Sequence, residues 1–116
     1  MAELEADIMR RIMIRASELG ARVFRNNTGQ AWQGEVTQLA NGDVLIRNPR
    51  PVRMGLCKGS SDLIGWNKAG RFVALEVKRP GGRPTPDQGL FISVVRGSGG
   101  IGSVVHSDSV LPDLLD

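Results

Sequence analysis

The residues of this chain that could do chemistry are two carboxylates and a lysine: Asp62, Glu76 and Lys78. Glu76 and Lys78 end the apolar run 72–75, and residues two apart in a strand project from the same face. Because both faces of this strand carry apolar residues, we expect a central strand, where charges are normally paired or bind a metal. Asp62 opens another candidate strand, residues 62–66. Two carboxylates and a lysine on adjacent strands would suit metal-dependent cleavage of a phosphodiester.

Composition narrows the class of protein and of metal site. The chain has 116 residues, 41% hydrophobic and 23% charged, so we expect one domain over residues 1–116. No apolar run approaches the ~20 residues of a membrane span and acids occur early, so we expect a cytoplasmic protein without membrane contact. Cys57 and His106 are the only cysteine and histidine. A metal would therefore be held mainly by oxygen ligands, which favours Mg²⁺ or Mn²⁺, with no organic cofactor expected.

Positive charge is concentrated in the first 96 residues, which hold all fifteen basic residues but only nine of the twelve acids. Between Asp43 and Asp62, every charged residue is basic, namely Arg47, Arg50, Arg53 and Lys58. A local excess of positive charge beside an acidic site fits a phosphate backbone as partner. The alternative is a solvated basic loop without a partner.

The hydrophobic pattern predicts an α/β fold with a mixed central sheet flanked by helices. Helices are expected at residues 2–19, from Thr85 to Gly97 and at about 109–115, with Gly20 ending the first. Strands are expected at residues 22–25, 31–33, 36–39, 44–46, 62–66, 71–78 and 101–105.

Three local signals refine this prediction. Asn41-Gly42-Asp43 is typical of a hairpin turn. Residues 48–61, with two prolines and two glycines, are predicted to form a long loop. Thr85, with Gln88 three positions later, predicts a helix capping box. The apolar face of that helix is expected to consist of Leu90, Phe91, Val94 and Val95.

The ordered set of motifs resembles the VRR-NUC (virus-type replication-repair nuclease) domain of the PD-(D/E)XK superfamily, roughly from residue 5 to residue 105. It comprises an acid near the start of the first helix, the pair Arg25-Asn26, Gly59-x-x-Asp62, Glu76-x-Lys78 and Gln88. One departure is Ser61, where members of the family often have proline. The resemblance implies a restriction-endonuclease-like core around the mixed sheet.

The resemblance also implies roles for the site residues. Asp62 and Glu76 would ligate the metal together with the main-chain carbonyl of Val77, and Glu5 would reach it directly or through water. Lys78 would either activate water or stabilise the transition-state anion. Beside two carboxylates it should stay charged, which favours the electrostatic role. Gln88 would support Lys78 near the substrate.

The implied substrate is DNA, contacted by residues Arg25, Asn26, Asn27, Arg50, Arg53, Lys58 and Arg79. Small members of the family are often phage-borne, standalone DNA-repair nucleases, associated with homodimers that act on four-way junctions. Two-fold symmetry matches paired cuts in a symmetric junction. The resemblance therefore implies a Holliday-junction-resolvase-like endonuclease.

Each assignment has a structural alternative. Glu76 and Lys78 could be a surface ion pair, Asp62 a turn cap and Gln88 only a helix cap. The carboxylate on the first helix could be Glu3 instead of Glu5, or a simple dipole partner. Residues 25–27 could only form a turn. Two other functions stay open: a non-catalytic nucleic-acid-binding module of the same fold, and a sequence-specific restriction-type endonuclease.

Overall fold

The computed structural model of the protein describes residues 3–116. The helices are α1 (Glu5–Glu18), α2 (Pro86–Gly97), the 3-10 helix η1 (Asp108–Val110) and α3 (Leu111–Leu114). The strands are β1 (Arg22–Arg25), β2 (Gly29–Gln38), β3 (Val44–Met54), β4 (Leu63–Trp66), β5 (Phe72–Val77) and β6 (Ile101–Val105). None of the helices within this described part is long and apolar enough to cross a membrane.

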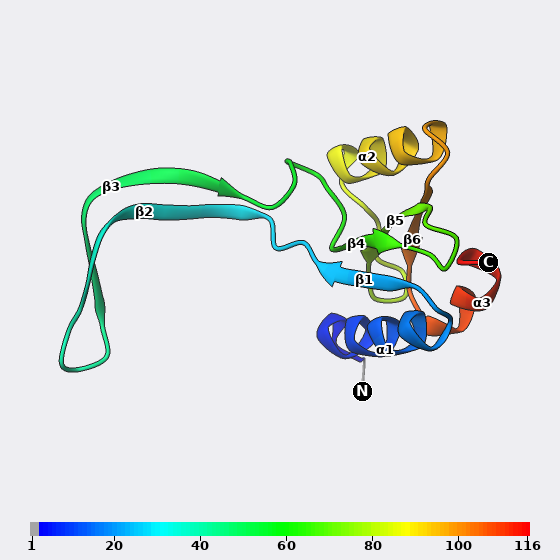
Figure 1. Cartoon of the computed structure of the whole chain (residues 1–116), viewed down its shortest axis with the longest axis horizontal. Coiled ribbons are helices and arrows are strands. Elements are labelled where there is room, and N and C mark those ends of the chain that lie inside the picture. Colours follow the sequence, from blue (N-terminus) through cyan, green and yellow to red (C-terminus); the bar gives the residue numbers. More distant parts are fainter. Residues whose placement is uncertain (1–2) are drawn as a thin grey trace.

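A four-stranded sheet, in the order β1-β4-β5-β6, forms the centre of the protein, with α1 on one face and α2 on the other (Figure 1). The strands β1, β4 and β5 are antiparallel, whereas β6 runs parallel to β5. The sheet is therefore mixed and flanked by helices, as predicted. Strand β5 is buried over five of its six residues, which confirms that it is a central strand.

The main core lies between the sheet and α1. Ile8, Ile12 and Ala16 recur at helical spacing and are fully buried. They pack with sheet residues and with the C-terminal segment, notably Leu63, Leu75, Val77, Val105 and Leu111. Burying each large side chain stabilises the fold by about 1.5–3 kcal/mol. Helix α1 begins at Glu5 and ends before Gly20, which has φ +83°; the predicted start at Ala2 lies outside the described residues.

Helix α2 begins as its sequence predicts but buries a different face. Thr85 accepts a hydrogen bond from the backbone N–H of Gln88, and the Gln88 side chain accepts one from the backbone of Thr85. The buried residues are Ile92 and Val95, whereas the predicted face is wrong at Leu90 and Val94, which are 64% and 59% exposed. The reason is that α2 packs on the sheet mainly through β5 and β6, so one narrow stripe of the helix is covered.

Strands β2 and β3 form a long antiparallel hairpin that projects from one end of the sheet (Figure 1), and we call residues 29–54 the arm. The turn at its tip is the predicted one, since the N–H of Leu39 bonds to the carbonyl of Asp43 and Gly42 has φ +93°. The arm gives the molecule its longest dimension, 50 Å.

The predicted loop over residues 48–61 is wrong for residues 48–54, which belong to β3. The short strands expected at 31–33 and 36–39 are likewise one strand, β2. Prolines fit here because each strand of a two-stranded ribbon has a free edge, where a missing N–H breaks no ladder. A bulge at Asn48, with φ 51°, lies opposite Gly34, where a Cβ would come within 2.6 Å of the Arg47 carbonyl oxygen.

Candidate active site

The register of β4 and β5 brings the two predicted carboxylates together. Leu63 pairs with Leu75, so the preceding Asp62 faces the following Glu76 across the strands. The Oδ2 of Asp62 accepts a hydrogen bond of 2.9 Å from the backbone N–H of Val77, which fixes this carboxylate at the end of β5. The structure therefore confirms the expected meeting of these carboxylates at one end of the sheet.

Lys78 completes the group. Its Nζ lies 3.7 Å from Oε1 of Glu76, and its side chain is 20% exposed while that of Glu76 is 2% exposed. The ion pair therefore lies at the border between the core and solvent, and the surface-pair alternative does not describe it. The ammonium group can meet a ligand from solvent, whereas the carboxylate behind it cannot leave the core.

Glu76 is held in an unfavourable environment for a negative charge. Burial, followed by its interaction with the Asp62 carboxylate, raises the pKa of Glu76 to about 8, and Lys78 offsets only part of this effect. The second carboxylate oxygen, Oε2, is buried and has no hydrogen-bond partner. Such a buried oxygen without a partner is uncommon in folded proteins, and this one is free to bind a cation.

Asn26 ties the end of β1 to the segment that leads into Asp62. Its Nδ2 donates to Oγ of Ser60 at 2.6 Å and to the carbonyl of Ser61 at 3.0 Å, while its Oδ1 accepts from the N–H of Leu56 at 2.9 Å. Its backbone N–H also donates to the carbonyl of Asp62. The side chain, predicted as a DNA contact, is thus hydrogen-bonded inside the protein and positions the segment that leads into Asp62.

A glycine allows the same segment to approach α2. Gly59 has φ +81°, and a Cβ there would lie 2.7 Å from the backbone of Asp87. Beside it, Nζ of Lys58 lies 3.5 Å from Oδ2 of Asp87, in a pair whose side chains are both more than half exposed. Glycine is required at this position of Gly59-x-x-Asp62 because the chain passes too close to the start of α2 to leave room for a side chain.

His106 supports the other side of the site. Its Nδ1 lies 3.1 Å from the carbonyl oxygens of both Lys78 and Arg79, and the N–H of Lys78 donates to the carbonyl of Val105. The main chain that carries the lysine is therefore held after β5 has ended. This contact agrees with a structural role for the histidine.

The donor set fits a hard divalent cation. Asp62 offers a carboxylate oxygen beyond the one bound to Val77, and Glu76 offers the orphaned Oε2. No group of three His, Cys, Asp or Glu side chains able to hold a metal occurs within residues 3–116. Glu5, exposed at the start of α1, does not join the pair in such a group. Water, main-chain carbonyls and substrate oxygens would fill the other positions, as is usual for Mg²⁺.

The alternative helix carboxylate, Glu3, is engaged elsewhere, because it forms an ion pair with Arg11, which also approaches Asp108 at 3.4 Å. Gln88 uses its side-chain oxygen in the capping box. A direct catalytic role for Gln88 and metal coordination by Glu5 or by the Val77 carbonyl stay predictions.

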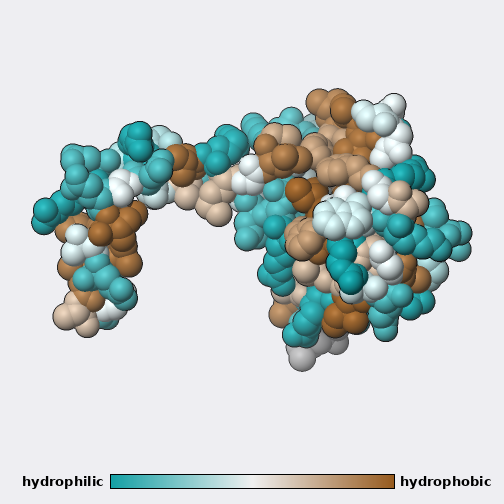
Figure 2. Space-filling view, viewed as in Figure 1, coloured by the Kyte–Doolittle hydropathy of each residue, from teal (hydrophilic) through white to brown (hydrophobic). Residues whose placement is uncertain are grey.

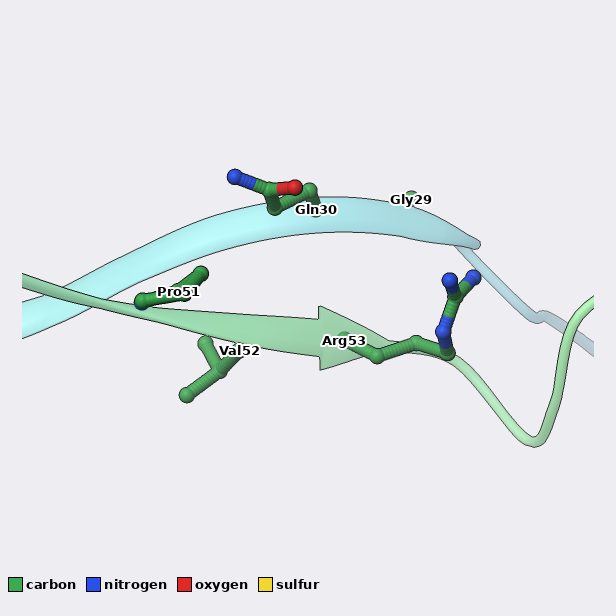
Figure 3. Close-up of a pocket in the computed structure, with 5 residues that line it drawn as sticks. All are labelled: Gly29, Gln30, Pro51, Val52 and Arg53. Atoms are coloured by element: carbon green, nitrogen blue, oxygen red, sulfur yellow. The ribbon is translucent and has the colours of Figure 1, made fainter.

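The basic residues predicted to contact DNA fall into two groups. Arg25, Asn27, Lys58 and Arg79 are exposed on the core near the site, while Arg50 and Arg53 are exposed on the arm. At the base of the arm is a small open hollow of about 180 Å³, lined by Gly29, Gln30, Pro51, Val52 and Arg53 (Figure 3). Gln30 and Arg53 point to one side of the ribbon and Val52 to the other, as their cross-strand register requires.

A mixed sheet that presents an Asp, a Glu and a neighbouring lysine at one end is the arrangement of a PD-(D/E)XK nuclease. The sequence model of the VRR-NUC domain matches residues 5–109, nearly the whole chain, so the protein belongs to the VRR-NUC family of nuclease modules. No curated protein matches the sequence significantly. Nucleases of the PD-(D/E)XK type generally use divalent metals and act on nucleic acid, which agrees with the donor set.

Sequence reasoning missed two features of this site. Ser60 was not singled out, although its hydroxyl is a buried link between Asn26 and the carbonyl of Cys57. The sequence predicts Asn26 as a DNA contact, whereas its side chain anchors the segment before Asp62, a role that depends on strand order. The sequence holds no signal for this role, because only the pairing of β1 with β4 places Asn26 beside the residues preceding Asp62.

Proposed function

We propose that this chain is a metal-dependent endodeoxyribonuclease, a single domain that hydrolyses phosphodiester bonds in branched DNA in the manner of a Holliday-junction resolvase. The observation that carries the proposal is the Asp62–Glu76 pair, with its orphaned buried oxygen, behind the partly exposed Lys78. Mg²⁺ or Mn²⁺ held there would supply a stronger water nucleophile and offset charge on the scissile phosphate.

The protein side of this mechanism divides among three groups. Asp62 and Glu76 would hold the cation, one fixed by the Val77 N–H and the other by burial. Lys78 would place its ammonium group against the negative charge that develops on the phosphate in the transition state. Its Nζ lies 3.7 Å from Glu76 and close to a second carboxylate, which favours this electrostatic role over that of a base.

Substrate recognition would rest on backbone charge. The exposed arginines at the base of the arm and around the site can contact phosphates, and such contacts carry no sequence information. A homodimer would present two sites to the two symmetric strands of a four-way junction. This favours a structure-selective enzyme over a sequence-specific one.

The test is cleavage of labelled four-way junction, flap, single-stranded and linear duplex DNA with Mg²⁺ or Mn²⁺, by the wild type and by Lys78→Ala. We expect paired nicks in the junction by the wild type and none by the variant. Defined fragments from linear duplex would instead support a restriction-type enzyme. Binding to the junction without cleavage in either metal would contradict the enzymatic proposal and leave a binding module.

A further inference from the structure

The Asp62–Glu76 pair and α2 lie on the same face of the central sheet. Glu76 and Ala74 project to one side of β5, because residues two apart in a strand share a face. Gly102, the partner of Ala74 on β6, lies against α2, since a Cβ there would come within 3.3 Å of the Ile92 side chain. We call this side the catalytic face, and α1 covers the opposite one.

Helix α2 covers only part of the catalytic face. It packs mainly on β5 and β6 and makes no comparable contact with β1 or β4 within residues 3–116. Phe24 pairs with Ile64, and Trp66 pairs with Phe72, so the register places all four residues on this face. The side of the face that α2 leaves open is therefore lined with aromatic residues.

Three of these residues form an exposed cluster, which we call the aromatic patch: Phe24, Trp66 and Phe72. They are 53%, 48% and 42% exposed. The rings of Phe24 and Trp66 lie 5.7 Å apart and are tilted by 50°. The tilt prevents the two rings from stacking face to face, so a flat ligand can still lie against them.

An apolar cavity of about 340 Å³ adjoins the aromatic patch, between Leu56, Phe72 and Phe91 of α2. Its volume is within the range of pockets that enclose small ligands. The chain has two tryptophans and three phenylalanines, so four of its five aromatic residues belong to the patch or to this cavity. Figure 2 shows hydrophobic groups on the core below α2, near the base of the arm, with hydrophilic residues on both sides.

The aromatic patch lies close to the carboxylates along the strands. Phe24 lies opposite Ile64, which follows Asp62 by two residues, or ~7 Å. Trp66 follows Asp62 by four residues, or ~13 Å. Successive nucleotides of one DNA strand are ~3.4 Å apart along a duplex. A strand with a phosphate at Asp62 would therefore pass the patch within about four nucleotides.

The surroundings of the aromatic patch are basic. The segments that carry it, residues 22–27 and 55–72, hold one acid, Asp62, and five basic residues: Arg22, Arg25, Lys58, Lys68 and Arg71. The ion pairs of Lys58 and Lys68 are on the surface, with lysine side chains 74% and 65% exposed, so solvent and other anions compete for both. This charge is complementary to a phosphate backbone and not to an acid-poor protein surface.

We propose that the aromatic patch binds unpaired nucleobases of the DNA strand that is cut at Asp62 and Glu76. Exposed aromatic rings beside basic side chains hold single-stranded nucleic acid, because the bases stack on the rings while the charges contact phosphates. Every base has a π-face, so stacking adds affinity for open strands without sequence preference. A branch point interrupts base stacking between the duplex arms, so its bases can turn toward the patch.

This inference rests on the proposed function, because it assigns a subsite for the DNA that the carboxylates would cut. The probes are a short thymidine oligonucleotide and an abasic oligonucleotide of equal length, and their binding is measured in chelator. The two strands carry the same phosphates, and only the first can stack. Cleavage of the four-way junction is measured separately, so a wild type that cleaves the junction but shows no preference for bases overturns this inference alone.

We expect the wild type to bind the thymidine strand at least about tenfold more tightly than the abasic strand. Trp66→Ala should reduce this ratio to less than about threefold by weakening only the binding of the thymidine strand, whereas Trp66→Phe should keep most of it. The matched control is Trp32→Ala, the other tryptophan of the chain, which lies in the arm and should keep the wild-type ratio.

Four results would overturn the proposal. The wild type could bind both strands equally or fail to bind the thymidine strand. Trp66→Ala could keep the ratio, or Trp32→Ala could lose it. If Trp66→Ala altered sedimentation of the protein and left the ratio unchanged, the patch would be a protein contact instead.

The fluorescence of Trp66 reports on stacking with the patch intact, and it decides the question if Trp66→Ala does not fold. In Trp32→Phe, Trp66 is the only tryptophan. A saturating thymidine strand should quench its emission, and a saturating abasic strand should leave it nearly unchanged. In Trp66→Phe, the remaining Trp32 should respond alike to both strands. Equal quenching of Trp66 by the two strands would contradict stacking on the patch.

Discussion

The end of the sheet that carries the carboxylates and the arm that projects beside it are built on opposite principles. At the sheet, charged groups lie at the border of the core and are held by the surrounding fold: Asp62 by the Val77 N–H, and the chain before it by Asn26. In the arm, apolar side chains such as Trp32 and Val36 are 55% and 65% exposed, so residues 3–116 leave more than half of each uncovered.

The comparison shows that each region has groups that are unsatisfied in their own environment: a polar atom in the core and apolar surface in solvent. The buried site has an oxygen on Glu76 with no partner, which a cation can satisfy. The exposed arm has apolar surface with no partner, which another protein surface can satisfy. Changes at the sheet should therefore alter chemistry and stability, whereas changes in the arm should alter binding and assembly.

The largest effect on stability is expected from Glu76→Gln. Burial and Asp62 raise the pKa of Glu76 to about 8, so between about pH 4.5 and pH 8 the folded state binds one more proton than the unfolded state. The free energy of unfolding of the metal-free wild type should then fall with rising pH by ~1.4 kcal/mol per unit, roughly 4 kcal/mol from pH 5 to 8.

Urea unfolding in chelator across this pH range measures that slope. Glu76→Gln should remove it, because glutamine does not titrate, and the variant should be more stable than the wild type at pH 8. Glu18→Gln, an exposed carboxylate on α1, should keep the wild-type slope. A flat profile in the wild type would contradict the assignment of Glu76 as a buried, uncompensated acid.

A smaller effect is expected from Asn26→Ala, which removes the side chain that joins Leu56, Ser60 and Ser61. Stability should fall by about 1–3 kcal/mol, because buried groups lose their partners. Cleavage at saturating protein should slow about tenfold, since Asp62 is less well positioned. Asn27 is an exposed neighbour, so Asn27→Ala should change neither the stability nor the cleavage rate.

The salt dependence of DNA binding distinguishes this positioning role from a phosphate contact. If Asn26 acts inside the protein, the slope of log affinity against log salt should be unchanged in Asn26→Ala. A reduced slope with an unchanged cleavage rate at saturation would show that Asn26 contacts DNA.

The smallest effect is expected from Arg53→Gln in the arm, and it concerns DNA affinity. Loss of one phosphate contact should weaken DNA binding several-fold at moderate salt and reduce the salt slope by about one. Arg10→Gln, the same change on α1 at the other face of the sheet, is the control. Equal effects of the two substitutions would indicate that only net charge matters and that the arm makes no specific contact.

The sheet was predictable from sequence because its signals are local and agree with one another. The apolar run before Glu76 defines a buried strand, and Thr85 with Gln88 defines a helix start. The meeting of Asp62 with Glu76 followed from two adjacent strands. These elements pack in one core, so each local preference is reinforced by burial.

For the arm, the sequence predicts the turn at its tip but not the full length of its strands, because these strands depend on pairing and not on burial. Pro49 and Pro51 indicate a loop when read alone, and only the partner strand shows that a free edge accepts them. The exposed face of α2 was misjudged for a related reason. Leu90 and Val94 look like core residues until the narrow contact of the helix with the sheet is known.

The central claim, that the sheet carries the chemistry while the arm contributes only to binding, is tested most directly by single-turnover cleavage of a four-way junction at saturating protein. Lys78→Ala should stay at least about 10²-fold slower than the wild type, because no concentration restores a missing transition-state contact. Arg53→Gln should return to the wild-type rate. Recovery of Lys78→Ala at saturation, or a persistent defect in Arg53→Gln, would contradict the account.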